Sequence, residues 1–310
     1  MRSMALCILL LATSQLNSVL AQVAVNPVVY NSPGAQYLQN FDGLPGSGTF
    51  TLSGKGPFNL SSSPINSNNL AGWQILMPGG SNTNAAFAVG TGSSTGNGIY
   101  SLGSSGSTER ALGSLSSSTG IYSMGLILTN NTGSVLNTLT ISFTAEQWRK
   151  GGSTNKNIWS FGYKTGIITQ MDQPDLLDEP NLNFSSVVNT SSATSLNGNL
   201  SDNQQTVSYT MHNITWKAGE QLLLRWDDAD EAGSDDVVGI DNFSFSATLV
   251  STSPTINNVV ASNITTGSAE LSASVNDNYA NTSVVFEYDT INTLTAPITI
   301  RASPDTLHAG

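Results

Sequence analysis

Short hydrophobic runs, rich in β-branched and aromatic residues, recur along the chain between clusters of Gly, Ser, Asn and Pro. Helical periodicity is almost absent, whereas apolar and polar residues alternate most regularly in Leu139–Thr144 and Asp241–Thr248. Such alternation is typical of strands buried on one face. The pattern therefore predicts an all-β protein with a sandwich or barrel. The expected strands are Ala24–Tyr30, Thr49–Leu52, Gly72–Leu76, Ala85–Gly90, Ile99–Leu102, Tyr122–Asn130, Leu136–Gln147, Asn157–Tyr163, Leu182–Phe184, Val207–Ile214, Gln221–Trp226, Ile240–Leu249, Ile256–Ile264, Ala269–Val275 and Ser283–Tyr288.

A polar segment at residues 250–254 divides this pattern into two predicted domains, because Ser251, Thr252, Ser253 and Pro254 are typical of a short linker. Residues 22–249 form the first domain. After Pro254 come an alternating AELSASV segment, a polar turn and a VVFEY segment, a series that resembles the opening of a fibronectin type-III module. Only 56 residues follow Pro254, whereas a whole module needs roughly 100. We therefore expect residues 255–310 to be a partial fibronectin type-III-like domain, apparently truncated.

Residues 1–21 are typical of a secretory signal peptide. Arg2 is followed by the apolar run Ala5–Ala12, and Val19–Ala21 supplies small residues for cleavage after Ala21. The run is shorter than the roughly 20 residues that cross a bilayer. The mature protein is therefore expected to be secreted or displayed at the cell surface, without insertion into the membrane.

The charge and cysteine content exclude several classes of function. Cys7, the only cysteine, lies in the predicted signal peptide, which excludes disulfides, thiolate catalysis and zinc–sulfur sites from the mature chain. The formal net charge is −11, and it becomes −12 when Arg2 is removed with the signal peptide. Nucleic acid and anionic membranes would repel such a chain, so neither is an expected partner.

Several motifs of the first domain resemble a β-sandwich module at the start of exported multi-domain surface proteins of Bacteroidota and related phyla. They are FDGLP at Phe41–Pro45, ERALGS at Glu109–Ser114, EQWRKGG at Glu146–Gly152, LRWDD at Leu224–Asp228 and VGIDNFSFSA at Val238–Ala247. No biochemical activity is assigned to that module, so the resemblance implies a class and a compartment rather than a reaction.

A broader resemblance is to jelly-roll carbohydrate-binding modules. These open with a strand of the form F-[ED]-x and close with one of the form I-D-[DN]-[VF], and Asn40–Asp42 and Gly239–Phe243 match those forms. The resemblance implies that the first and last strands lie side by side and that their acidic residues hold a structural calcium ion. It also implies a glycan or another extracellular polymer as the partner, although no set of exposed aromatic residues is identifiable here.

Seven of the 21 acidic residues lie between Asp227 and Asp241. Calcium prefers six to eight oxygen ligands, so we consider a structural calcium site formed by Asp42, Asp228, Asp230 and Asp241. An EF-hand is excluded because Ala232 and Gly239 occupy positions that should carry ligands. The alternative is a solvated acidic loop.

Glu109 and Glu146, each followed by an arginine in its motif, offer a second arrangement. Paired carboxylates hydrolyse glycosidic bonds, so a polysaccharide-degrading glycosidase or lyase is the alternative function. A structural network of ion pairs with Arg110 and Arg149 explains the same residues, and nothing in the spacing favours catalysis. With no Ser-His-Asp arrangement identifiable around His212, we predict no catalytic residue.

The candidate ligand-binding residues are Trp148, Arg149 and Tyr100. Flat aromatic rings stack on sugars, and Trp148 adjoins a basic pair and the Gly151-Gly152 turn. The alternative is that these rings pack in a core. The sequence thus predicts a non-catalytic extracellular binding or adhesion module, with an enzyme or a purely structural spacer as the alternatives.

Overall fold

A computed structural model describes residues 26–249, 253–278, 282–290 and 293–307 of this protein. The predicted signal peptide and residues 250–252 of the predicted linker lie outside the described residues. Within them the chain is built of strands, with two single-turn 3₁₀ helices, η1 (Pro180–Leu182) and η2 (Ser201–Asn203). No helix in the described ranges is long and apolar enough to cross a membrane.

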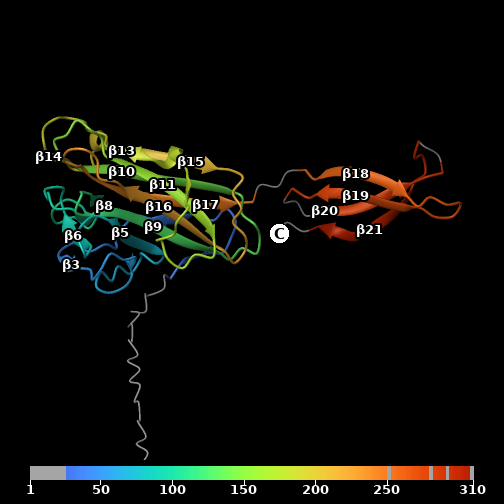
Figure 1. Cartoon of the computed structure of the whole chain (residues 1–310), viewed down its shortest axis with the longest axis horizontal. Helices are drawn as coiled ribbons and strands as arrows, with labels where there is room; N and C mark the ends of the chain where they lie inside the picture. The colour runs from blue at the N-terminus through green and yellow to red at the C-terminus, as the bar shows by residue number, and fades with distance from the viewer. Residues whose placement is uncertain (1–25, 250–252, 279–281, 291–292, 308–310) are drawn as a thin grey trace, which may run out of the picture.

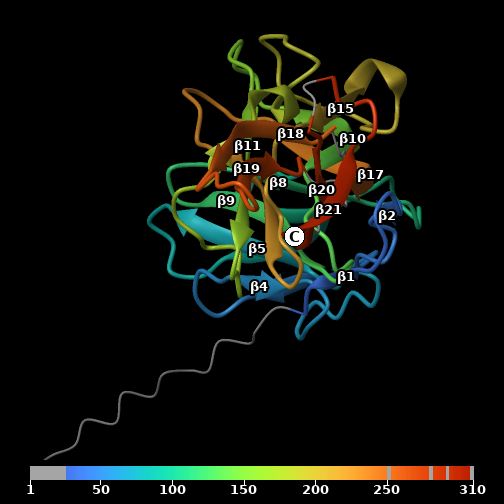
Figure 2. The same ribbon diagram turned by 90° about the vertical axis from the view of Figure 1, so that its right-hand side faces the viewer.

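Two mainly antiparallel sheets face each other in residues 26–249 (Figures 1 and 2). In sheet A the order is β12-β11-β16-β9-β5-β4, with β1 paired in parallel to β9 and β13 paired to β11. Its strands are β1 (Val28–Tyr30), β4 (Phe58–Asn59), β5 (Trp73–Gly79), β9 (Ile121–Asn130), β11 (Ile158–Gly166), β12 (Leu177–Asp178), β13 (Phe184–Ser185) and β16 (Gln221–Asp228).

Sheet B has the order β14-β10-β17-β8-β7-β6-β3, with β15 paired to β10 and β2 paired to β17. Its strands are β2 (Tyr37–Gln39), β3 (Thr49–Thr51), β6 (Ala86–Gly90), β7 (Gly98–Leu102), β8 (Ala111–Leu115), β10 (Thr138–Lys150), β14 (Thr194–Ser195), β15 (Gln204–Met211) and β17 (Val237–Thr248). Sheet A contributes β5, β9 and β11 to one layer in Figure 2, and sheet B contributes β10 and β17 to the other. The predicted all-β sandwich is therefore confirmed.

Aromatic rings fill the space between the sheets. Trp73 of β5 stacks on Trp226 of β16, with ring centroids 6.2 Å apart and an interplanar angle of 14°. Phe243 of β17 meets both rings edge-on, at 5.3 and 5.9 Å. Because each such pair contributes about 0.5–1.5 kcal/mol beyond its buried area, this cluster joins the two layers firmly without a disulfide.

The sequence pattern missed or misassigned several elements. Ala111–Leu115 forms β8, although its Gly and Ser content concealed the strand. Leu182–Phe184, predicted as a strand, instead spans the end of η1 and the start of β13, because Pro180 initiates a helical turn. Single turns and two-residue bridges are too short to produce a periodic pattern, so they are not visible in the sequence.

The described residues beyond 252 form two separate two-stranded sheets. One pairs β18 (Thr255–Ser262) with β19 (Glu270–Asn276), and the other pairs β20 (Thr282–Tyr288) with β21 (Ile298–Leu307). β21 was not predicted. The likeness of this region to a fibronectin type-III domain remains a prediction.

Candidate functional site

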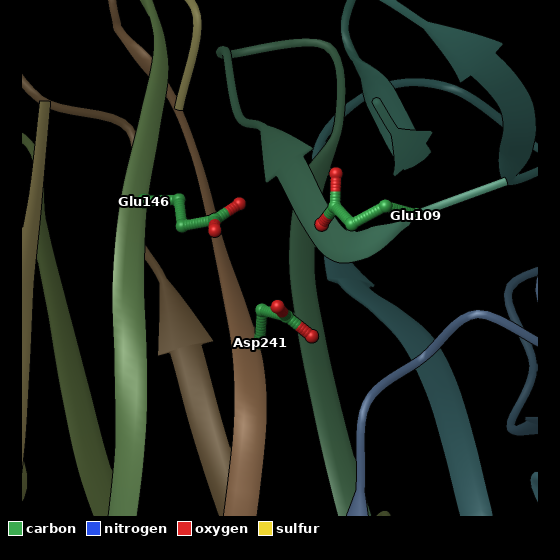
Figure 3. Close-up of side chains that lie close together, drawn as sticks. All are labelled: Glu109, Glu146 and Asp241. Atoms are coloured by element: carbon green, nitrogen blue, oxygen red, sulfur yellow. The ribbon is translucent and has the colours of Figure 1, made fainter. Parts of the chain in front are cut away.

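Three carboxylates from distant parts of the chain meet on sheet B. Glu146 lies on β10 and Asp241 on the adjacent strand β17, while Glu109 lies two residues before the start of β8, which flanks β17 on the other side. One oxygen from each lies within 4.8 Å of the others, and Figure 3 shows the three side chains directed toward one another. We call Glu109, Glu146 and Asp241 the carboxylate cluster.

The cluster lies on the face of sheet B that is turned away from the aromatic core. Successive side chains of a strand point to opposite faces, and the neighbours Ala145 and Ile240 belong to the core between the sheets. Glu146 and Asp241 therefore point outward. They are nevertheless 3% exposed each, because Trp148 and the segment around Gly198 and Asn199 cover this face.

Hydrogen bonds satisfy only part of the cluster. Trp148 Nε1 donates to Glu146 Oε2 (2.9 Å), Asn242 Nδ2 donates to Asp241 Oδ2 (2.7 Å), and Asn199 Nδ2 donates to Glu109 Oε2. Asp241 Oδ1 and Glu109 Oε1 are buried and accept no hydrogen bond. Among the described residues no lysine or arginine forms an ion pair with any of the three carboxylates.

Burial without a cation raises the pKa of these groups. Desolvation raises the pKa of Glu146 to about 8, and the charges of Asp241 and Glu109 add to the effect. Desolvation likewise raises the pKa of Asp241 to about 7, with contributions from Glu109 and Asp42. An anionic cluster at this position is therefore costly unless a positive charge enters it.

Asp42 lies beside the cluster but not within it. Its side chain is exposed, Asp42 Oδ1 accepts a hydrogen bond from the Arg110 backbone N–H (3.1 Å), and Asp42 Oδ2 accepts one from Asn40 Nδ2. Its charge nevertheless contributes to the raised pKa of Asp241. The structure thus places Asp42 and Asp241, which the sequence grouped as metal ligands, in one neighbourhood.

Asp228 and Asp230, the other predicted metal ligands, lie elsewhere. Asp228 is on β16 of sheet A, where it is buried and accepts hydrogen bonds from Ser114 Oγ of sheet B and from Asn157 Nδ2 (2.9 Å). Asp230 is exposed in the loop between β16 and β17. The proposed four-residue set is therefore wrong as a single site, because proximity in the sequence concealed that these strands belong to different sheets.

The predicted network of glutamate–arginine ion pairs is absent from the part of the chain that the structure describes. Arg110 is buried, but its guanidinium donates to the carbonyl oxygens of Ser107 (2.7 Å) and Gly46 (3.5 Å) rather than to a carboxylate. Arg149 forms no ion pair either. The two glutamates consequently face Asp241 and each other.

A buried ion pair that the sequence did not predict joins Lys150, at the end of β10, to Asp236. Lys150 Nζ is 3.1 Å from a carboxylate oxygen of Asp236, and the two side chains are 0% and 1% exposed. Asp236 also accepts hydrogen bonds from Gln147 Nε2 (3.1 Å) and from the Gly151 N–H (2.7 Å). Lys150 is therefore paired with Asp236, and its positive charge does not neutralise the carboxylate cluster.

The three predicted ligand-binding residues have different environments. The rings of Trp148 and Tyr100 are buried in one small core, together with Leu102, Ala111, Leu115 and Val237. Neither ring presents a face to solvent, in agreement with the alternative that these rings pack in a core. Arg149, next along β10, lines a cavity with Asp230 and Asp235.

The comparisons with known proteins leave the family open. No family model matches the chain, and no curated protein matches it. Among solved structures, it is similar to the CBM22-1 xylan-binding domain of Paenibacillus barcinonensis Xyn10C, with 9% identity and a TM-score of 0.32 over 71% of this chain and 98% of that one. It is also similar to the K3 cleaved adhesin domain of Lys-gingipain from Porphyromonas gingivalis, with 12% identity and a TM-score of 0.33 over 57% and 91% of the two chains. At these TM-scores the likenesses carry no argument about function.

Proposed function

We propose that this protein is a non-catalytic extracellular binding module whose first domain is held together by a structural calcium ion at Glu109, Glu146 and Asp241. One observation carries the calcium site: three carboxylates converge, and one oxygen of Asp241, a residue only 3% exposed, is buried and accepts no hydrogen bond. Secretion through residues 1–21 and a fibronectin type-III-like second domain at residues 255–310 are parts of the same proposal.

The donor set favours calcium over other cations. All the available ligand atoms are oxygens, the type preferred by hard cations, and calcium binds oxygens at 2.3–2.6 Å without a fixed geometry. Two oxygens on one such ion lie at most about 4.8 Å apart, roughly twice a mean distance of 2.4 Å. The oxygens of the cluster already meet that condition, so a small adjustment of side chains would bring all three residues onto one ion.

The same geometry argues against the glycosidase alternative. A sugar ring would have to enter between Glu109 and Glu146, but Glu146 is buried and accepts a hydrogen bond from Trp148. We therefore expect the carboxylates to support the fold rather than to contact a polymer.

Thermal unfolding of the mature chain tests the calcium site. We expect saturating calcium to raise Tm by about 5–10 °C relative to chelator, because a ligand at 100 times its Kd stabilises by about 2.7 kcal/mol. Asp241→Asn and Glu146→Gln should each abolish this shift. Asp178→Asn, which removes an exposed carboxylate on β12, is the matched control and should keep it.

Terbium luminescence gives a second measurement that does not depend on stability. Terbium binds oxygen donors as calcium does, and Trp148, which is bonded to Glu146, lies close enough to sensitise its emission. The site would be supported if added calcium displaces terbium and so quenches the emission, and if the Asp241→Asn variant shows no emission. A Tm that calcium leaves unchanged, together with terbium emission that survives Asp241→Asn, would contradict it.

A further inference from the structure

A polar cavity opens beside Arg149, at the end of β10 that pairs with β14. Its volume is about 200 Å³. Four chain segments form it: Thr95 before β7, Leu115–Ser117 at the end of β8, Arg149 and Gly151 at the end of β10, and Asp230 with residues 233–235 of the loop between β16 and β17. Ends of sheet B strands and this loop thus build its walls.

Two charged groups of the cavity have hydrogen-bonding capacity that the protein does not use. The guanidinium of Arg149 forms no hydrogen bond or ion pair within the described part of the chain, although Asp230 and Asp235 line the same cavity. Asp235 Oδ2 is buried and accepts no hydrogen bond. Donors and acceptors are therefore both available, and the protein itself does not use them.

The wall that carries Asp235 is held rigidly in place. Next to it in the chain, Asp236 is fixed by the buried ion pair with Lys150 and by the Gly151 N–H. A Cβ at Gly151 would overlap the carbonyl oxygens of Ser234 and Asp235, so only glycine permits this close approach. A preformed wall reduces the entropy that a ligand must offset on binding.

We propose that this cavity binds one neutral, polyhydroxylated sugar residue, whose hydroxyls accept hydrogen bonds from Arg149 and donate to Asp230 and Asp235. The inference rests on the proposed binding function, and it assigns to that function a place and a ligand class. The volume lies below the roughly 300–1,000 Å³ of pockets for larger ligands, which limits the occupant to one small unit of a chain.

The charges select a neutral ligand. An acidic sugar would face Asp230 and a chain with a net charge of −11, whereas a cationic ligand would face Arg149. Desolvation, reinforced by the charge of Glu231, raises the pKa of Asp235 to about 8. Its carboxyl group therefore carries a proton at neutral pH and adds a second donor, which suits hydroxyl groups better than a charged ligand.

The expected affinity is low. None of the residues lining the cavity is aromatic, so the stacking that supplies much of the contact area in many sugar sites is missing. We expect dissociation constants in roughly the millimolar range. Tight binding to a polymer would then need several modules on one chain.

Saturation-transfer NMR of the mature chain, in calcium, tests the site with the methyl glycosides of glucose, galactose, mannose and xylose, and with glucuronic acid as the charged comparison. We expect at least one neutral glycoside to bind and glucuronic acid to bind more weakly. Arg149→Gln and Asp235→Ala should each weaken binding about tenfold. The control Lys156→Gln removes an exposed charge outside the cavity and should leave binding within about twofold of the unmodified chain.

The outcomes separate this inference from the proposed function. Binding that Arg149→Gln leaves unchanged, in a variant with an unaltered melting curve, overturns the cavity but keeps a binding module. No glycoside binding at roughly 20 mM, with the calcium shift intact, overturns the sugar ligand and leaves a calcium-stabilised spacer. Binding that depends on Arg149 without any calcium shift supports the cavity and overturns the calcium site.

Discussion

Acidic residues are concentrated both in the loop between β16 and β17 and in the carboxylate cluster, but the carboxylates of the two regions have different partners. In and beside the loop, Asp236 is paired with Lys150 and Asp228 receives hydrogen bonds from Ser114 and Asn157, although Asp235 Oδ2 in the loop is buried without a hydrogen bond. In the cluster, Glu109, Glu146 and Asp241 face one another without a cationic side chain among the described residues. The density of acidic residues in the sequence is therefore a poor guide to where a cation is needed. What matters is which buried oxygens remain without a partner.

Removing Lys150 should have the largest effect on stability. Lys150→Met leaves the buried carboxylate of Asp236 without its counter-charge, which costs about 3–5 kcal/mol. Urea denaturation measures this loss. Lys156→Met, an exposed lysine of the following loop, should change stability by less than about 0.5 kcal/mol. The double variant Lys150→Met/Asp236→Asn should recover part of the loss, and a double variant no more stable than Lys150→Met would contradict a charge effect.

Asp228 should make the protein less stable as the pH rises. Burial raises the pKa of Asp228 in the folded state to about 7, above its unfolded value of 3.8. The folded state therefore binds more protons between about pH 4 and pH 7, and stability falls across that window. The side chain of the Asp228→Asn variant is neutral at every pH. Between pH 5 and pH 8 the free energy of unfolding should therefore fall by about 1–3 kcal/mol less in this variant than in the unmodified chain. Parallel curves of unfolding free energy against pH for the two proteins would rule this out.

Asp241→Asn should stabilise the calcium-free protein. The substitution removes one of three facing carboxylates while its amide oxygen can still accept from Asn242. In chelator at pH 8 we expect a gain of about 1–2 kcal/mol in the free energy of unfolding, measured in urea. In saturating calcium the order should reverse, with the unmodified chain more stable. A variant that is less stable in both conditions would show that Asp241 supports the fold without an ion.

The smallest effect is expected at Asp227, an acidic residue of the same LRWDD motif as Asp228. Its ion pair with Arg225, at 3.0 Å, is partly exposed, with the two side chains 35% and 19% accessible. Asp227→Asn should cost about 0–1 kcal/mol in urea, since solvent screens such pairs. A cost as large as that of Lys150→Met would mean that exposure does not separate the two kinds of pair.

Much of the fold was predictable from the sequence because strand signals are local. Alternation in Leu139–Thr144 and Asp241–Thr248 identified β10 and β17, the two strands that carry Glu146 and Asp241. β8 was missed, since Gly113 and Ser114 interrupt its apolar pattern. The site was predicted only in part: Asp42 and Asp241 are neighbours, whereas Asp228 and Asp230 are not members of the cluster.

The sequence by itself determined the class of protein, an all-β sandwich stabilised by a packed core rather than by disulfides, because residue periodicity and cysteine content are properties of the chain alone. Only the tertiary structure decided which charges meet. Glu109, Glu146 and Asp241 lie far apart in the chain and converge because β17 lies between β10 and β8. Likewise, Lys150 pairs with Asp236, whereas the adjacent Arg149 lines the cavity. Pairing between strands is set by packing across the whole domain, and no local pattern encodes it.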